Sequence, residues 1–126
     1  MHEVIYTKHA PEPIGPYSQA ILAGNTLYVS GQIPINPETT QLIKSSIEEE
    51  THQVMKNIAA ILKEAGADFS NVVKCGIFVK DMGDFAKVNE VYGQYFLDNP
   101  PARETVEVSA LPKNVNVEIS CIAYIA

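Results

Sequence analysis

Apolar and polar residues alternate along several stretches of the chain, and this alternation is typical of half-buried β-strands. Gly24 and Asn25 lie between two of these stretches and predict a hairpin turn. Proline-rich loops precede and follow the hairpin, because proline and glycine interrupt regular structure. The predicted strands are residues 2–6, 19–23, 27–30, 71–81, 103–110 and 115–121.

Two other stretches repeat apolar residues at the spacing of an α-helix. The first runs from Ile47 to Ala65, after a capping box of Ser46 and Glu49, and Gly66 is placed to end it. The second covers residues 84–96. Its inward-facing side chains are expected to be Phe85, Val88, Tyr92 and Phe96.

The order of these elements predicts a single α+β domain over residues 1–126, with both helices on one face of a mixed sheet. In the strand at 71–81, Val73 and Cys75 are expected to face the helices, whereas Val72 and Phe78 face away from them. The second face is therefore partly apolar with no helix to cover it. We expect a symmetric oligomer to close over this face.

The amino-acid composition of the chain argues against several classes of protein. The chain is 46% hydrophobic and 19% charged, with a net charge of −6, and shows no basic stripe of the kind that binds nucleic acid. It has no apolar run of about 20 residues for a membrane helix, and its start lacks the pattern of a secretory signal. Cys75 and Cys121 have no motif spacing, so we expect core residues in a reducing cytoplasm.

The last two strands carry charged side chains in an otherwise apolar pattern. Arg103, Thr105 and Glu107 share one face of the first, and Glu118 lies among polar positions of the second. A short turn at 111–114 would pair the two strands antiparallel, with both polar rows on the uncovered face. Arg103 and Glu118 would then project from that face together.

These two residue types suit one kind of chemistry. An arginine binds a carboxylate through two parallel hydrogen bonds, and a glutamate accepts a proton from water. A solvated sheet face or a cross-strand salt bridge between Arg103 and Glu118 would also explain the pattern. Glu107 is able to play either part.

Three further residues are candidates for the same site. Tyr17 lies in a stiff loop and either packs or donates a hydrogen bond. Ser30 ends a strand before Gly31, but has no histidine partner that would make it a nucleophile. Asn89 lies close to the buried stripe of its helix and either braces a loop or reaches a site. The histidines lack ligand spacing, so we expect no metal site.

Four motifs occur in order along nearly the whole chain: IGPYSQA at 14–20, SGQIP at 30–34, F-KVNEVYGQYF at 85–96, and PPAR-TVEVSALPK--NVEI at 100–119. Together they resemble the RidA family, the YjgF-type reactive-intermediate deaminases. The resemblance implies a chorismate-mutase-like α+β protomer. It also implies a homotrimer whose sheets form a central barrel, with sites in clefts between subunits.

The resemblance also implies an activity: cofactor-independent hydrolysis of enamine and imine intermediates, such as those of 2-aminoacrylate and 2-aminocrotonate, to 2-oxo acids and ammonia. By residue match, Arg103 binds the substrate carboxylate, Thr105 donates a backbone hydrogen bond, and Glu118 orients the water. Tyr17, Ser30 and Gly31 match positions contributed by a neighbouring subunit, and Asn89 matches a support position.

The chain departs from the common family pattern after the proline pair. Many members read Arg-Ser-Cys, where this chain has Arg103, Glu104 and Thr105. A backbone contact survives this change, but any role of the thiol is lost. Glu104 should alternate to the face opposite Arg103. The alternative function is a binding or regulatory module of the same fold that binds 2-oxo acids without turnover.

Overall fold

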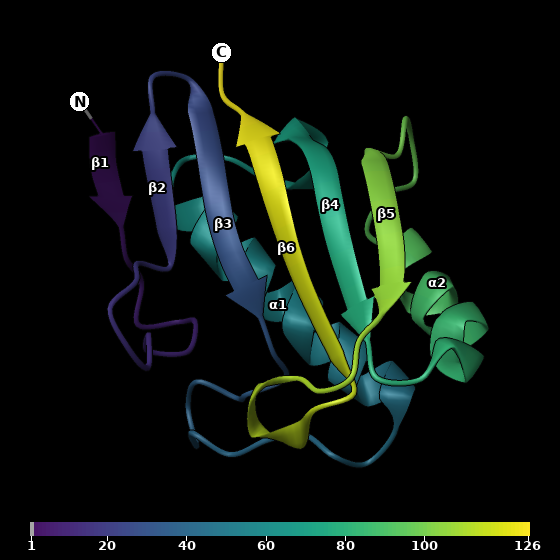
Figure 1. Ribbon diagram of the computed structural model, residues 1–126. Coiled ribbons are helices and arrows are strands. Elements are labelled where there is room, and N and C mark those ends of the chain that lie inside the picture. The colour runs from purple at the N-terminus through teal and green to yellow at the C-terminus, as the bar shows by residue number, and fades with distance from the viewer. Residues whose placement is uncertain (1) are drawn as a thin grey trace.

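The computed structural model describes residues 2–126 and has one six-stranded sheet with two α-helices packed on one face (Figure 1). This confirms the predicted α+β class and the placement of both helices. The helices are α1 (Ile47–Glu64) and α2 (Phe85–Gly93). The strands are β1 (His2–Ile5), β2 (Ala20–Ala23), β3 (Thr26–Gln32), β4 (Val72–Val79), β5 (Ala102–Glu107) and β6 (Val117–Tyr124).

The strand order in the sheet is β1-β2-β3-β6-β4-β5, and all neighbours are antiparallel except β4 and β5. The predicted hairpin of the last two strands is therefore wrong. β4 lies between β5 and β6, and β5 runs parallel to β4 at the edge of the sheet. The physical reason is the crossover through α2, which joins β4 to β5 and returns the chain in the same direction.

Helix α1 covers the middle of the sheet and supplies the largest share of the core. The Ser46 hydroxyl accepts a hydrogen bond from the Glu49 amide at 3.1 Å and caps the first turn. Gly66, with φ of +78°, ends the helix in the left-handed region. Within residues 2–126, no helix has the length and apolar character needed to cross a membrane.

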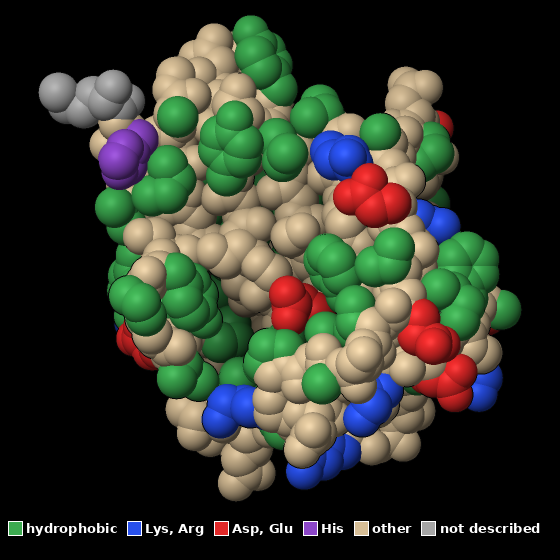
Figure 2. All heavy atoms as spheres, viewed as in Figure 1, with side chains coloured by type: hydrophobic (Ala, Val, Ile, Leu, Met, Phe, Trp, Pro, Cys, Tyr) green, Lys and Arg blue, Asp and Glu red, His purple; other side chains and the backbone are tan. Residues whose placement is uncertain are grey.

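The open face of the sheet carries exposed apolar side chains, as predicted, although the assignments of Val72 and Val73 in β4 were reversed. A β-bulge between Val72 and Lys74 shifts the alternation by one residue. Val72 is consequently buried and Val73 is exposed. Figure 2 shows hydrophobic side chains gathered over the upper part of this face. Those exposed along the strands are Val4, Tyr28, Val73, Val106 and Tyr124.

Candidate functional site

Arg103 and Glu118 do not share a face of the sheet. Arg103 pairs with Cys75 across β4 and β5, and Cys75 is buried in the core under the helices. Glu118 pairs with Phe78 across β4 and β6, on the open face. The sequence expectation that both project from the open face is therefore wrong, and so is the alternative of a salt bridge between them. The expectation failed because it assumed that the two strands pair in a hairpin, and this pairing assigned Arg103 to the wrong face of the sheet.

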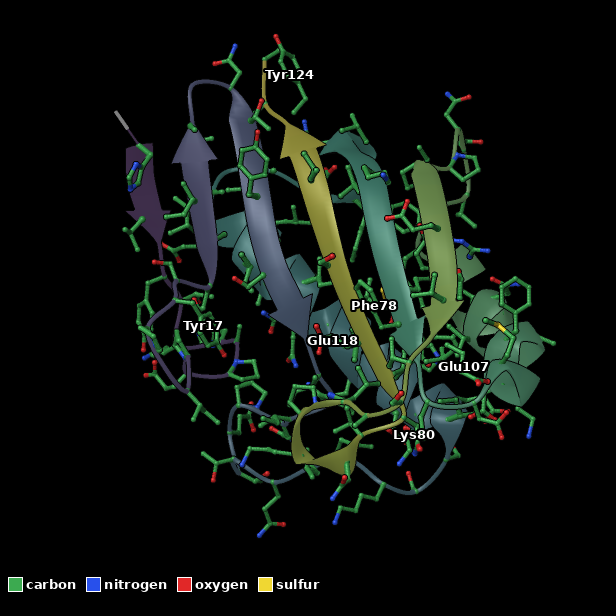
Figure 3. All side chains as sticks on the ribbon, in the orientation of Figure 1. Tyr17, Phe78, Lys80, Glu107, Glu118 and Tyr124 are labelled. Atoms are coloured by element: carbon green, nitrogen blue, oxygen red, sulfur yellow. The ribbon has the colours of Figure 1, made fainter. Side chains whose placement is uncertain are left out.

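Glu118 lies in a cavity of about 430 Å³ on the open side of the protomer. Figure 3 shows its side chain beside the lower end of β3, with Tyr17 on the loop that precedes β2. Tyr17, Ser30, Gly31 and Glu118, expected on separate grounds, are thus brought together in one cavity. The remaining lining residues are Pro11, Glu12, Ile14, Gln19, Gln32, Ile33, Ile35, Pro112 and Lys113.

A bulge in β3 admits the Glu118 carboxylate. Val29 pairs with Cys121 and Gln32 pairs with Ile119, so β3 has one residue more than β6 at this point. Gly31 lies in the bulge. A Cβ atom at Gly31 would come within 2.2 Å of Glu118 Oε2 and 2.8 Å of its Cδ. The close approach of the carboxylate to the β3 backbone therefore requires glycine here.

The loop that carries Tyr17 is fastened by a buried amide. Gln19 is 2% exposed; its Nε2 donates to the carbonyl oxygens of Thr7 at 3.0 Å and Pro11 at 2.9 Å, and its Oε1 accepts from the Thr7 amide at 2.7 Å. The Ser30 hydroxyl donates to the Ser18 carbonyl at 2.6 Å. Ser30 is thus committed to holding the loop, while the half-exposed Tyr17 ring faces the cavity.

Burial raises the pKa of Glu118 above its ordinary value of 4.5. The carboxylate loses hydration in the cavity and, among residues 2–126, forms no ion pair that would offset this loss. A carboxyl group with a raised pKa is a stronger base once ionised, which suits it to taking a proton from water near neutral pH.

Arg103, the only arginine in the sequence, is held by α2 at the sheet edge. Its Nη1 donates to Asn89 Oδ1 at 2.6 Å. The guanidinium carbon lies 5.1 Å from the ring centroid of Tyr92 and 5.6 Å from that of Phe85. The amide and the two rings fix the plane of the guanidinium without neutralising its charge. The group therefore remains available to bind an anion.

Two buried hydroxyls beside Arg103 lack a well-formed hydrogen bond within residues 2–126. They belong to Thr105 on β5 and Tyr92 on α2. Thr105 pairs with Ile77 and shares the helix-facing side of β5 with Arg103. Burial raises the pKa of the Tyr92 hydroxyl, which lies by the Cys75 thiol, and keeps it a donor at neutral pH. Unpaired buried hydroxyls next to a cation are typical of a site that binds a polar ligand.

The two glutamates of β5 are engaged elsewhere. Glu104 forms an ion pair of 3.1 Å with Lys74. It lies opposite Arg103, as predicted, but on the open face, because Arg103 itself faces the helices. Glu107 accepts a hydrogen bond from the Met82 amide at 2.7 Å and so holds the turn before α2. Glu107 is therefore not placed to serve in place of Glu118.

Sequence reasoning missed the buried polar residues that fix the cavity walls. Asn57 on α1 donates to the carbonyl oxygens of Ile33 and Ile35, and Glu50 on α1 accepts from the Asn116 amide and side chain. The available signal was a polar residue at a buried position of the α1 stripe. Within residues 2–126, no three acidic, histidine or cysteine side chains come together as metal ligands.

Comparisons with known proteins agree with this architecture. The Endoribonuclease L-PSP family model matches residues 7–125. The RutC family protein of Pyrococcus horikoshii is 56% identical over 124 residues, covering 98% of each chain. The human 2-iminobutanoate/2-iminopropanoate deaminase is 49% identical over 123 residues, covering 98% of this chain and 90% of the human one.

Solved structures match over almost the full length. A putative endoribonuclease from Thermotoga maritima superposes with a TM-score of 0.98 at 48% identity, covering 100% of this chain and 99% of the other. E. coli TdcF with bound serine superposes with a TM-score of 0.94 at 36% identity, covering 98% and 99%. The chain therefore belongs to the Endoribonuclease L-PSP family, which includes the RutC and RidA proteins.

Proposed function

We propose that this protein is a deaminase that hydrolyses reactive imines of small 2-amino acids to 2-oxo acids and ammonia. Relatives from Arabidopsis thaliana and human, 50% and 49% identical, are named as a reactive intermediate deaminase and a 2-iminobutanoate/2-iminopropanoate deaminase. The observation that carries the proposal is the Glu118 carboxylate, half-buried in a cavity beside Gly31 and Tyr17, with its pKa raised by burial.

The working site is formed by two copies of the chain. Arg103 and Glu118 lie on opposite faces of the sheet, so one protomer does not bring them to the same substrate. The open face carries exposed Tyr28, Val106 and Tyr124, which a symmetric homo-oligomer would cover. In a homotrimer, Arg103 on the edge strand of one protomer reaches the Glu118 cavity of its neighbour.

In this site, the guanidinium of Arg103 binds the substrate carboxylate and holds the imine carbon in the cavity. Glu118 takes a proton from water while the oxygen bonds to that carbon, and the C=N double bond becomes a C–N single bond. The nitrogen then takes up the proton from Glu118 and the proton of the new hydroxyl group, and leaves as ammonia while the C=O bond of the 2-oxo acid forms. The unpaired hydroxyl of Thr105 offers a further donor to the carboxylate.

A coupled assay tests this activity. A threonine dehydratase supplies the unstable imine, and 2-oxobutanoate release is followed with and without the protein. We expect the wild type to accelerate release, and Arg103→Ala and Glu118→Gln to give only the spontaneous rate. Lys87→Ala and Glu90→Gln, which change exposed residues of α2, should behave as the wild type. Equal rates with and without wild-type protein would contradict the proposal and favour the 2-oxo acid binding module.

A further inference from the structure

Lys113 is the only basic residue among the described residues that line the Glu118 cavity. The same lining contains two carboxylates, of Glu12 and Glu118, and the whole chain has a net charge of −6. The proposed substrate carries a carboxylate and is repelled by this field. Within one protomer, Lys113 is therefore the cation that offsets this repulsion at the cavity.

The backbone at Lys113 is not the one that a lysine prefers. Lys113 has φ of 55° and ψ of 22°, and Asn114 follows with φ of 57°. Asparagine and glycine adopt this left-handed region readily, whereas a long side chain does so at a cost. Local conformational preference accounts for Asn114 but not for a lysine at 113. Strained residues of this kind occur where the side chain serves the site.

The loop holds Lys113 in a fixed place. Leu111 and Val115, on either side of the short turn, are buried in the protein. The Glu50 carboxylate accepts hydrogen bonds from the Asn116 amide at 3.1 Å and from its side chain at 2.7 Å. Glu50 is 3% exposed, so this anchor is shielded from water. The Lys113 backbone is thus fastened on both sides, and the exposed residue is part of the cavity lining.

We propose that Lys113 attracts the anionic, carboxylate-bearing substrate to the Glu118 cavity. This inference rests on the proposed function. Lys113 acts on substrate entry, before Arg103 binds the carboxylate, and takes no part in the hydrolysis. Its removal should consequently raise KM and leave kcat nearly unchanged.

The left-handed backbone gives a clean test, because glycine fits it better than lysine. Lys113→Gly removes the charge without straining the loop, so its melting temperature should equal or exceed that of the wild type. At low ionic strength we expect kcat/KM to fall about tenfold, with a weaker dependence on salt. Lys113→Arg should stay close to the wild type. Lys63→Gln is the control, because it removes the same charge at the exposed end of α1, away from the cavity.

The inference is overturned if Lys113→Gly keeps the kcat/KM and salt dependence of the wild type, or if Lys113→Arg behaves like Lys113→Gly. If the wild type itself fails to accelerate imine hydrolysis, the proposed function fails separately. The dissociation constant of 2-oxobutanoate then decides the inference. About tenfold weaker binding by Lys113→Gly at low salt supports it, and equal binding, or no binding by the wild type, overturns it.

Discussion

The side chains of Arg103 and Glu118 lie on opposite faces of one sheet, although only β4 separates their strands. Arg103 pairs with Cys75, and Glu118 pairs with Phe78, three positions further along β4. Side chains at an odd spacing along a strand point to opposite faces. Rotamer changes therefore do not bring the two groups to one small molecule. The proposed mechanism therefore needs a second copy of the chain to supply one of them.

Gly31→Ala tests the fit of the Glu118 carboxylate against β3. The added Cβ would lie 2.2 Å from Oε2 of Glu118, so the carboxylate has to move away. We expect kcat to fall about a hundredfold, because a shift of about 1 Å in a reacting group has that effect. Steady-state kinetics measure the loss of activity, and the melting temperature measures any loss of stability.

Gly93→Ala is the matched control, because a Cβ atom there meets nothing within 4 Å. It should leave the activity unchanged. If Gly31→Ala also retains full activity, the place assigned to Glu118 is wrong.

Removing the acid at Glu118 should change how stability depends on pH. Burial raises its folded-state pKa above 4.5, so the folded protein binds this proton more tightly than the unfolded chain. Stability from this group is present at pH below 4.5 and is lost as pH rises through the raised pKa. Glu118→Gln should therefore gain stability relative to the wild type over this rise. Urea unfolding at a series of pH values and one protein concentration measures the difference.

The same raised pKa should appear in the kinetics. Since the ionised carboxylate takes the proton from water, kcat/KM should rise with pH through that pKa.

A stability difference between wild type and Glu118→Gln that does not vary with pH would show that the carboxyl group is not desolvated.

Asn89→Asp tests whether the Arg103 charge must stay free. Asn89 Oδ1 accepts from Arg103 Nη1 at 2.6 Å, and an aspartate there would form an ion pair with the guanidinium. We expect about a tenfold rise in KM for the anionic substrate, since the two charges compete. Asn25→Asp, in the turn between β2 and β3, adds the same charge elsewhere. An unchanged KM in Asn89→Asp would exclude Arg103 as the carboxylate ligand.

The Glu50 anchor predicts an effect on stability. Glu50→Ala leaves the Asn116 amide and side chain without their acceptor, which should lower the free energy of unfolding by about 1–3 kcal/mol. Glu49→Ala, at an exposed position of the same helical turn, should cost only about 0.5 kcal/mol. Denaturant unfolding measures the free energy of unfolding of both variants. Equal losses in the two variants would mean that the buried anchor contributes nothing specific.

The sequence was sufficient to predict the helices and strands, but not how β5 and β6 are arranged in the sheet. Apolar spacing and the Ser46 cap located α1 to within a few residues, because the helical period and the cap are local properties. The hairpin predicted at 111–114 was wrong, because pairing depends on the whole sheet. The strand–helix–strand order of β4, α2 and β5 was the signal that favours a parallel pair.

For the candidate site, too, the sequence predicted residues but not how the strands around them are arranged. The family resemblance assigned Glu118, Tyr17 and Gly31 to one kind of site, and the structure places these three around one cavity. The sequence did not reveal the bulges in β3 and β4, because an extra residue leaves the local pattern almost unchanged. These bulges admit the Glu118 carboxylate beside Gly31 and expose Val73.

The most direct test of a site shared between copies is complementation between two inactive variants. Arg103→Ala and Glu118→Gln are each expected to be inactive, and equal amounts are unfolded together and refolded into mixed oligomers. A shared site predicts that about a quarter of the sites in random mixed trimers regain both groups, with activity to match. No activity in the mixture, although mixed oligomers form, would contradict the account.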